Sequence, residues 1–226
     1  FGTLNPVLIS AAPDREVANY IFDSLIRQDY ETLEFKPRLA WSWEDRDVVV
    51  EKEDGQKTGV IVSRDEKFIR FVEGASPRTF LKNDLVSFTA GPSGSAKLKD
   101  KWGGGELNGY ITEFEYTIKV DTSTAPDAAA TEIPLERLAT YEVSLGDKTE
   151  TRPAAKPSCC FRFFIRPNLK WSDGEPLTAD DWVFTLDAIR NPNIKDAANL
   201  RNYYADLEAY RSSDKGLTLE YIWTKP

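Results

Sequence analysis

Two pairs of closely spaced carboxylates are the residues of this sequence that come nearest to a catalytic pattern. Asp180 and Asp181 are adjacent, and Asp45 and Asp47 are separated by one residue. Glycoside hydrolases use two carboxyl groups that flank the bond they cleave, so an acid-pair glycosidase is one interpretation. Asp180 and Asp181, however, fall at the expected start of a helix, where the macrodipole favours negative charge. We therefore predict no catalytic residues, and an enzyme ranks third among the candidate functions.

The composition removes several other chemistries. The sequence contains no His, which excludes His-based acid–base catalysis, His-containing catalytic triads and His metal sites. Its only cysteines, Cys159 and Cys160, are adjacent and cannot supply the spaced ligands of a zinc site. We interpret them as two buried thiols, with a strained vicinal disulfide as the alternative. The glycines at 103–105 lack the spacing of a phosphate-binding loop. We predict no metal and no cofactor.

Charge and hydropathy narrow the class of protein. The 226 residues carry a net charge of −8, which disfavours a nucleic-acid partner because such a partner needs a clustered basic face. A hydrophobic content of 41% indicates a folded globular chain. No apolar run reaches the roughly 18 residues of a membrane-spanning helix. The chain begins at Phe1 rather than Met, so we expect that targeting information has been removed from it.

The elements that position these residues centre on the stretch from Phe161 to Trp182. Apolar residues alternate at the start of this stretch, which predicts a largely buried strand over 161–166. Residues 171–174 (Trp-Ser-Asp-Gly) have the composition of a tight turn. Thr178 lies three residues before Asp181, which predicts a capping box at the start of a helix that ends before Pro192.

The flanking segments give further elements. Apolar residues recur at helical spacing from Val17 to Leu25, so we predict a helix that starts near Ser10 or Asp14 and runs to about Ile26 or Arg27. Trp41 and Trp43 alternate with a serine, which predicts one strand face. We expect a weaker helical stretch over 195–210 and a strand over 217–223.

Residues 45–158 have a different sequence pattern, in which short β-prone runs are separated by glycine-rich turns. This spacing predicts a small antiparallel sheet or barrel. We also expect a loop at 125–130, a short helix at 135–138 and a linker at 149–158. The predicted strands are 48–50, 59–62, 68–72, 85–89 and 110–120.

Five short motifs occur in one order along the chain. They are Leu4-Asn5-Pro6, Leu25-Ile26-x-x-Asp29, Pro37-x-Leu39-Ala40-x-Ser42-Trp43, Arg166-x-x-x-Lys170-Trp171-Ser172-Asp173-Gly174 and Pro176-Leu177-Thr178-Ala179-x-Asp181. In kind and order they resemble the family 5 extracellular solute-binding proteins, the peptide- and nickel-type receptors of ABC importers. The resemblance covers residues 3–44 and 161–226. It departs from the family pattern in the long interval between Trp43 and Phe161, which family members span with about a dozen residues, and in the length of the chain.

The resemblance implies a fold and a division of the chain. The fold is mixed α/β, part of lobe I of a type II periplasmic-binding-protein fold with a β-rich inserted module. The division is 1–44 and 159–226 as lobe I, with 45–158 as the insertion. Family members are usually more than twice this long, so the second lobe is missing here, by natural truncation or, as we favour, by cutting. Half of a closing cleft cannot bury a peptide, so this chain alone should bind ligand poorly.

The resemblance also implies a function and a site. The receptor would be periplasmic or extracellular, with anchoring through a removed N-terminal segment left open. It would bind extended oligopeptides or similar small solutes and deliver them to a membrane permease. The ligand-binding candidates are Ser10, Ala11 and Ala12, in the loop before the first helix, and Tyr203 or Tyr204. The Trp-Ser-Asp-Gly and Thr-Ala-Asp-Asp segments are assigned to the scaffold.

A second hypothesis from another class stays open. The solute-binding lobe could serve as the scaffold of an interaction or assembly module, whose β-rich region binds a protein or cell-surface partner. A contiguous exposed apolar patch within 45–158 would favour it.

Overall fold

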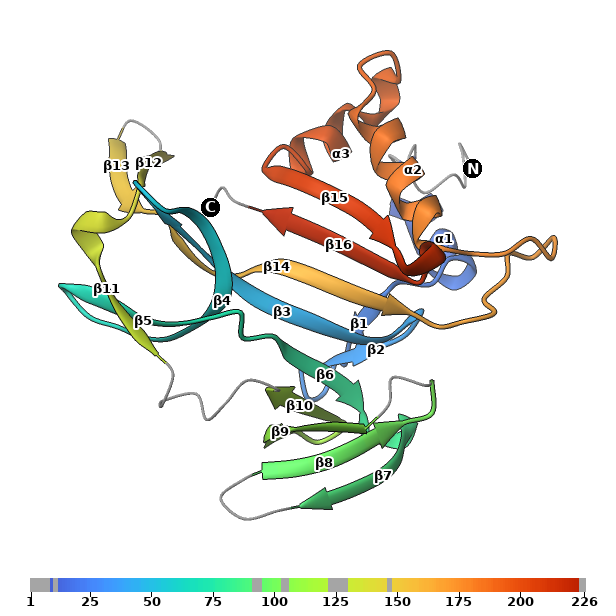
Figure 1. The fold of residues 1–226 in the computed structure, drawn as a ribbon. Coiled ribbons are helices and arrows are strands. Elements are labelled where there is room, and N and C mark those ends of the chain that lie inside the picture. Colours follow the sequence, from blue (N-terminus) through green and yellow to red (C-terminus); the bar gives the residue numbers. More distant parts are fainter. Residues whose placement is uncertain are drawn as a thin grey trace.

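A computed structural model describes residues 9, 12–90, 95–102, 106–121, 130–145 and 148–223. The described chain is mixed and rich in sheet, with helices gathered beside β15 and β16 (Figure 1). The helices are α1 (Ala12–Ile21), α2 (Ala179–Arg190) and α3 (Ala198–Tyr203), with short 3-10 turns at Lys82–Asp84, Leu135–Arg137, Lys195–Ala197 and Asp214–Gly216. No helix within the described ranges is long and apolar enough to cross a membrane.

The strands are mostly short, apart from three near the centre of the fold. The long ones are β3 (Ala40–Glu51), β4 (Gly55–Arg64) and β14 (Ala155–Ile165). The others are β1 (Ile26–Gln28), β2 (Phe35–Pro37), β5 (Phe68–Glu73), β6 (Pro77–Leu81), β7 (Leu85–Ala90), β8 (Ser95–Asp100), β9 (Glu106–Glu113), β10 (Thr117–Asp121), β11 (Thr131–Pro134), β12 (Thr140–Leu145), β13 (Lys148–Pro153), β15 (Leu207–Ser213) and β16 (Thr218–Trp223).

The long strand β3 is the branch point of the main sheet. One edge pairs with β14, which continues to β16 and β15. The other edge pairs first with β6, at residues 42–44, and then with β4, at residues 47–51. The sheet therefore forks into a β4–β5–β11 arm and a β6–β10–β9–β8–β7 arm (Figure 1). Each described strand pair is antiparallel, and β1–β2 and β12–β13 form separate hairpins.

The predicted elements around Phe161 are confirmed. β14 ends at Ile165, the Gly174 N–H donates to the Trp171 carbonyl at 3.0 Å, and Gly174 has a φ of 94°. The capping box is formed, with the Thr178 N–H donating to the Asp181 carboxylate at 2.8 Å. The helix it starts ends at Arg190. Local chemistry specifies this segment, because each signal acts within a few residues.

The turn between β15 and β16 packs directly against the start of α2. Gly216 has a φ of 82°, and a Cβ added there would lie 2.8 Å from the Thr178 Cβ. Any side chain at this position would meet both a strained backbone and a clash. Glycine therefore allows the hairpin to approach the N-terminus of α2.

The prediction that the first helix runs to Ile26 or Arg27 is wrong. α1 ends at Ile21, and Ile26 begins β1, which pairs with β2. The Asp29 carboxylate accepts hydrogen bonds from the Thr32 N–H at 3.0 Å and from the Lys36 ammonium at 2.6 Å. These bonds close a hairpin turn, and Ile26 packs against a core cluster. Tertiary burial and the turn override the helical spacing of the sequence.

Trp41 and Trp43 do not share a strand face, so that prediction is also wrong. Ser42 pairs with Phe164 but Ala40 pairs with Ile165, so Trp41 is the extra residue of a β-bulge. Trp41 packs with Phe80 and Phe164, whereas Trp43 packs with Phe163 against α2. The bulge sends two rings with a regular sequence spacing into two different cores.

Three more expectations need correction. Residues 110–120 form parts of two strands, because the Phe114 N–H donates to the Thr117 carbonyl and closes a turn between β9 and β10. Residues 149–158 are not a linker, since all of them except Ala154 belong to β13 or β14. The helix expected over 195–210 ends at Tyr203, and β15 begins at Leu207.

Other expectations for the middle of the chain fare differently. The short helix at 135–138 is confirmed as a 3-10 turn, Leu135–Arg137. Most of the predicted loop at 125–130 lies outside the described residues. The predicted domain boundaries, after residues 44 and 158, fall inside β3 and β14, and the division stays a prediction.

Candidate functional site

An open cleft of about 1340 Å³ lies beside the helices, on the face of the sheet that carries Trp43 and Phe163. Its walls come from segments far apart in the sequence: two hairpins, the sheet and the end of α3. The lining is mostly apolar and aromatic. The residues are Asp23, Ser24, Leu25, Ile26, Thr32, Leu33, Glu34, Phe35, Trp43, Asp45, Thr79, Phe114, Glu115, Thr117, Lys119, Phe161, Phe163, Trp182, Tyr203, Tyr204, Tyr221 and Trp223.

Aromatic rings from neighbouring strands form the floor of the cleft. Phe161 and Phe163 alternate on β14 and Tyr221 and Trp223 on β16, and alternate residues of a strand face the same side. The ring centroids of Phe163 and Tyr221 are 6.0 Å apart, and those of Tyr221 and Trp223 are 5.5 Å apart in an edge-to-face arrangement. Burial raises the pKa of the Tyr221 hydroxyl, and the nearby Tyr204 hydroxyl adds to this effect. Tyr221 is therefore neutral over the physiological pH range.

The C-terminal end of α3 places two tyrosines at the side of this floor. Tyr203 and Tyr204 stand edge to face with centroids 5.1 Å apart, and both line the cleft. Tyr204 is partly buried, which raises its pKa, whereas the Tyr203 side chain is 76% exposed. Tyr203 therefore contacts Tyr204 but leaves most of its surface exposed at the cleft.

The other candidates predicted from the sequence are Ser10, Ala11 and Ala12. Ser10 and Ala11 lie outside the described residues. Ala12 is the exposed first residue of α1 and is not part of the cleft lining. The assignment of these three residues to ligand binding stays a prediction.

The β1–β2 hairpin forms one wall of the cleft and is internally braced. Lys36 donates to Asp29 at 2.6 Å, and this contact, together with backbone hydrogen bonds from Thr32 and Glu31, lowers the pKa of Asp29 far below its ordinary value. The same hydrogen bond raises the pKa of Lys36. The Lys36 ammonium also lies 3.2 Å from the centroid of the Tyr116 ring, in the turn after β9. The pair thus fixes the hairpin and links it to a second one.

Glu34 completes the link between the two hairpins. Its carboxylate accepts a hydrogen bond from the Tyr116 N–H at 3.1 Å and another from the Thr117 hydroxyl. Within β10, Lys119 donates to Asp45 of β3 at 2.7 Å, and both residues line the cleft. These contacts hold the β9–β10 hairpin against the β1–β2 hairpin and β3, as part of the cleft wall.

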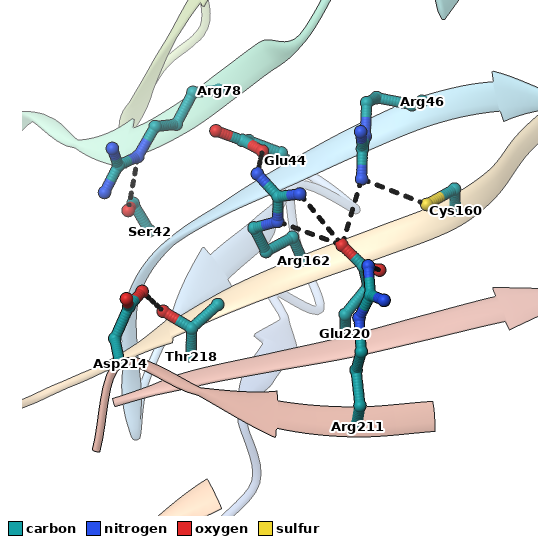
Figure 2. Close-up of polar contacts among 10 residues, drawn as sticks. All are labelled: Ser42, Glu44, Arg46, Arg78, Cys160, Arg162, Arg211, Asp214, Thr218 and Glu220. Atoms are coloured by element: carbon teal, nitrogen blue, oxygen red, sulfur yellow. Dashed lines mark hydrogen bonds and ion pairs between the residues drawn. The ribbon is translucent and has the colours of Figure 1, made fainter. Parts of the chain in front are cut away.

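The opposite face of the same strands carries charge instead of rings (Figure 2). Five registered positions on β15, β16, β14, β3 and β6 alternate in sign across the sheet. Arg162 donates to Glu220 at 2.9 Å and to Glu44 at 3.2 Å. We call this row the charge ladder, and its members are Arg211, Glu220, Arg162, Glu44 and Arg78. The acids of the charge ladder bind the arginines beside them, so we interpret the ladder as a structural feature of the sheet.

Two neighbours extend the polar face shown in Figure 2. Arg46 donates to Glu220 and to the Cys160 thiol, both at 3.2 Å. Burial raises the pKa of Cys160. Cys159 and Cys160 are both buried, and no disulfide joins them. This arrangement agrees with the interpretation of two buried thiols.

The carboxylate pairs of the sequence have separate structural roles. Asp181 caps α2, and Asp180 accepts from the Ser212 hydroxyl. Asp45 is paired with Lys119, and Asp47 accepts the Ile61 N–H at 2.5 Å. Neither the Trp-Ser-Asp-Gly turn nor the Thr-Ala-Asp-Asp cap lines the cleft, in agreement with their assignment to the scaffold.

Comparison with known proteins gives a family match for the segment from β14 to β16. Residues 155–221 match the family model described as bacterial extracellular solute-binding proteins, family 5 middle. The match supports a family 5 solute-binding protein. None of the curated proteins and none of the solved structures gives a significant match to the chain.

The family 5 match begins at the start of β14 and ends within β16. It therefore includes Phe161, Phe163, Tyr203, Tyr204 and Tyr221 of the cleft. Family 5 proteins act outside the cytoplasm, and the match supports a role in solute binding for ABC import.

Of the residues predicted to bind ligand, Tyr203 and Tyr204 line the cleft, and their role as ligand contacts stays a prediction. Most of the other lining residues were not predicted. The spacing of Trp43 and Phe163 predicts strand positions, and such spacing does not distinguish a buried core from the floor of a cleft. The residues of the β9–β10 turn were missed for a different reason. Their position at the cleft depends on pairing with Glu34, about 80 residues earlier in the chain.

Proposed function

We propose that this chain is the ligand-gathering part of an ABC-importer receptor. In this proposal the cleft binds extended oligopeptides or similar small solutes, and the receptor delivers them to a membrane permease. The observation that carries the proposal is the open aromatic cleft, about 1340 Å³ in volume, part of whose floor comes from the residues that match family 5.

The chemistry of the cleft suits such ligands. Aromatic rings supply a large apolar contact area, and ligand sites are commonly mostly apolar clefts with a few placed polar groups. The strands, the braced hairpins and α2 provide a preformed floor and wall. A further lobe would supply the opposite side, so we expect only weak binding, with a Kd of about 0.1–1 mM, from this chain alone.

Calorimetric titration with a mixed set of tripeptides tests the proposal. Tyr203→Ala should weaken binding roughly tenfold, because the variant removes an exposed ring at the cleft. Phe184→Ala is the matched control, since Phe184 is 74% exposed on α2 and does not line the cleft. Equal affinities for the two variants, or no binding at millimolar peptide, would contradict the proposed site.

The interaction-module hypothesis receives no observation of its own. Within 45–158, the exposed large apolar side chains in the described part of the chain are Val86, Phe88 and Phe114. Phe114 belongs to the cleft, and the other two lie on strand β7.

A further inference from the structure

The β-rich region of residues 45–158 contributes directly to the cleft. Asp45, Thr79, Phe114, Glu115 and Lys119 all line it. Two of them, Phe114 and Glu115, sit in the turn between β9 and β10 and are exposed. This turn therefore connects two strands and also places the Phe114 ring and the Glu115 carboxylate in the cleft lining.

The turn is held where it is by contacts that do not depend on its own exposed side chains. Glu34 binds the Tyr116 N–H and the Thr117 hydroxyl, and Lys36 covers the Tyr116 ring. These contacts fix the chain at Tyr116 and Thr117, next to the exposed side chains of Phe114 and Glu115 that line the cleft. Pre-organised groups of this kind bind with a smaller loss of conformational entropy.

The charges of the lining have a clear bias. Four carboxylates, on Asp23, Glu34, Asp45 and Glu115, line the cleft with a single cation, Lys119. Lys119 is paired with Asp45 at 2.7 Å, and the Arg38 guanidinium, at 3.4 Å, partly offsets Asp23.

Among the described residues, two carboxylates at the β9–β10 wall, Glu34 and Glu115, form no ion pair within 4.0 Å. Lys36, whose charge interacts with that of Glu34, is bound to Asp29 at 2.6 Å. Glu115 is hydrogen-bonded to the Tyr116 hydroxyl, which raises the pKa of Tyr116. This wall is therefore electronegative at neutral pH.

The aromatic floor points to the same ligand chemistry. Cations are attracted to the faces of Trp and Tyr rings, most strongly where water is partly excluded. Trp43, Trp182, Trp223, Tyr204 and Tyr221 all line the cleft. Ring faces and surplus carboxylates both stabilise positive charge, whereas neither stabilises an anion.

We propose that the β9–β10 turn is a ligand-selecting wall, and that it favours solutes with an ammonium or guanidinium group beside an apolar body. Phe114 contacts the apolar part and Glu115 lies near the cation. Glu34 is a positioning residue, which acts by holding the turn. The inference rests on the proposed solute-binding function and assigns part of that function to the region between β3 and β14.

Two capped tripeptides test the preference without interference from terminal charges. The cationic probe is N-acetyl-Lys-Phe-Lys-amide, and the anionic probe is N-acetyl-Glu-Phe-Glu-amide. The unaltered chain should bind the cationic probe roughly fivefold more tightly, as expected for an exposed charge interaction. The ratio should approach one in about 1 M salt, where the Debye length is about 3 Å.

Three variants separate the roles of the wall residues. Glu115→Gln should lower the ratio of the two affinities by roughly two- to fivefold. Phe114→Ala should weaken both probes by about tenfold and leave the ratio unchanged. Glu34→Gln should lower the ratio and also the affinity for both probes. Glu113→Gln is the matched control, because Glu113 ends β9, pairs with Lys82 at 2.7 Å and does not line the cleft.

The outcomes distinguish this inference from the proposed function. If both probes bind equally, or if Glu115→Gln and Glu113→Gln behave alike, the selecting wall is wrong and solute binding stands. If neither probe nor any tripeptide binds at millimolar concentration, both proposals fail. Phe114, Glu115 and Glu113 are exposed, so their variants should melt within about 1 °C of the unaltered chain. A larger change would show that the turn has a structural role instead.

Discussion

Replacing Arg162 by Met should destabilise the fold much more than the same change at Arg211, although both guanidinium groups bind Glu220. Arg162 lies in the middle of the charge ladder and joins Glu220 to Glu44 (Figure 2). The side chains of Glu220 and Glu44 are only 6% and 11% exposed. Arg211 lies at the edge strand and its side chain is 71% exposed.

The loss in free energy of unfolding depends on which ion pairs Glu220 and Glu44 keep after each substitution. Without Arg162, Glu220 keeps Arg46 at 3.2 Å and also Arg211, but Glu44 loses the ion pair that the structure shows for it. Removing one partner of a buried pair costs about 3–5 kcal/mol, and the partial compensation at Glu220 reduces this to about 2–4 kcal/mol. Removing Arg211 should cost less than about 1 kcal/mol, as for an exposed ion pair.

The difference should also depend on pH. Burial alone raises the pKa of Glu220, but the hydrogen bond from Arg162 and the charges of Arg162, Arg211 and Arg46 outweigh it and leave the pKa below 4.5. A carboxyl with a lowered folded-state pKa stabilises the fold above its unfolded-state pKa, and the stabilisation is lost as pH falls through the folded-state value. The effect of Arg162→Met should therefore be largest near neutral pH and shrink below about pH 4.5.

Urea denaturation followed by circular dichroism at pH 7 and at pH 4 measures both quantities. The reasoning predicts a loss of about 2–4 kcal/mol for Arg162→Met at pH 7, a smaller loss at pH 4 and little change for Arg211→Met. Equal losses for the two variants at pH 7 would refute the argument, because burial of the two acids would then not matter. A loss that grew on acidification would contradict the sign of the Glu220 shift.

Two further predictions concern the junction of α2 with the β15–β16 turn. Gly216→Ala should lower the melting temperature by about 4 °C or more in a thermal scan, because it combines positive φ with a clash against Thr178. Gly174→Ala, at a φ of 94° in open space, should cost less, and the reverse order would contradict the close approach. Thr178→Ala should remove about 1 kcal/mol in urea denaturation, and no loss would show that Asp181 alone caps the helix.

The parts of the fold that could be predicted from sequence are those whose causes are local. The alternation in β14, the glycine of the turn at 171–174 and the spacing of Thr178 and Asp181 act over a few residues, and all three features are present. Helical spacing between Val17 and Leu25 misled the prediction, because Ile26 gains more from pairing in β1 and from burial. The bulge at Trp41 has no local sequence signal.

Little of the cleft could be predicted, because tertiary pairing assembles it. Trp43 and Phe163 are adjacent across β3 and β14 although they are 120 positions apart in the sequence. The β9–β10 turn is held at the cleft by Glu34 and Lys36 of another hairpin, and nothing in the turn's own residues specifies those partners. Alternation of apolar and polar residues along a strand indicates which face of the sheet carries the rings. It does not show whether that face is a buried core or the floor of a cleft.

The central claim is that the aromatic cleft receives the ligand, and the tryptophans of the chain test it directly. Three of the six, Trp43, Trp182 and Trp223, line the cleft, whereas Trp41, Trp102 and Trp171 do not. With 5-fluorotryptophan incorporated, fluorine NMR gives one signal for each ring, and single Trp→Phe variants assign them. Adding a binding tripeptide to millimolar concentration should shift the signals of the first three and leave the other three in place. Shifts confined to Trp41, Trp102 or Trp171, or no shift at any ring, would contradict the account.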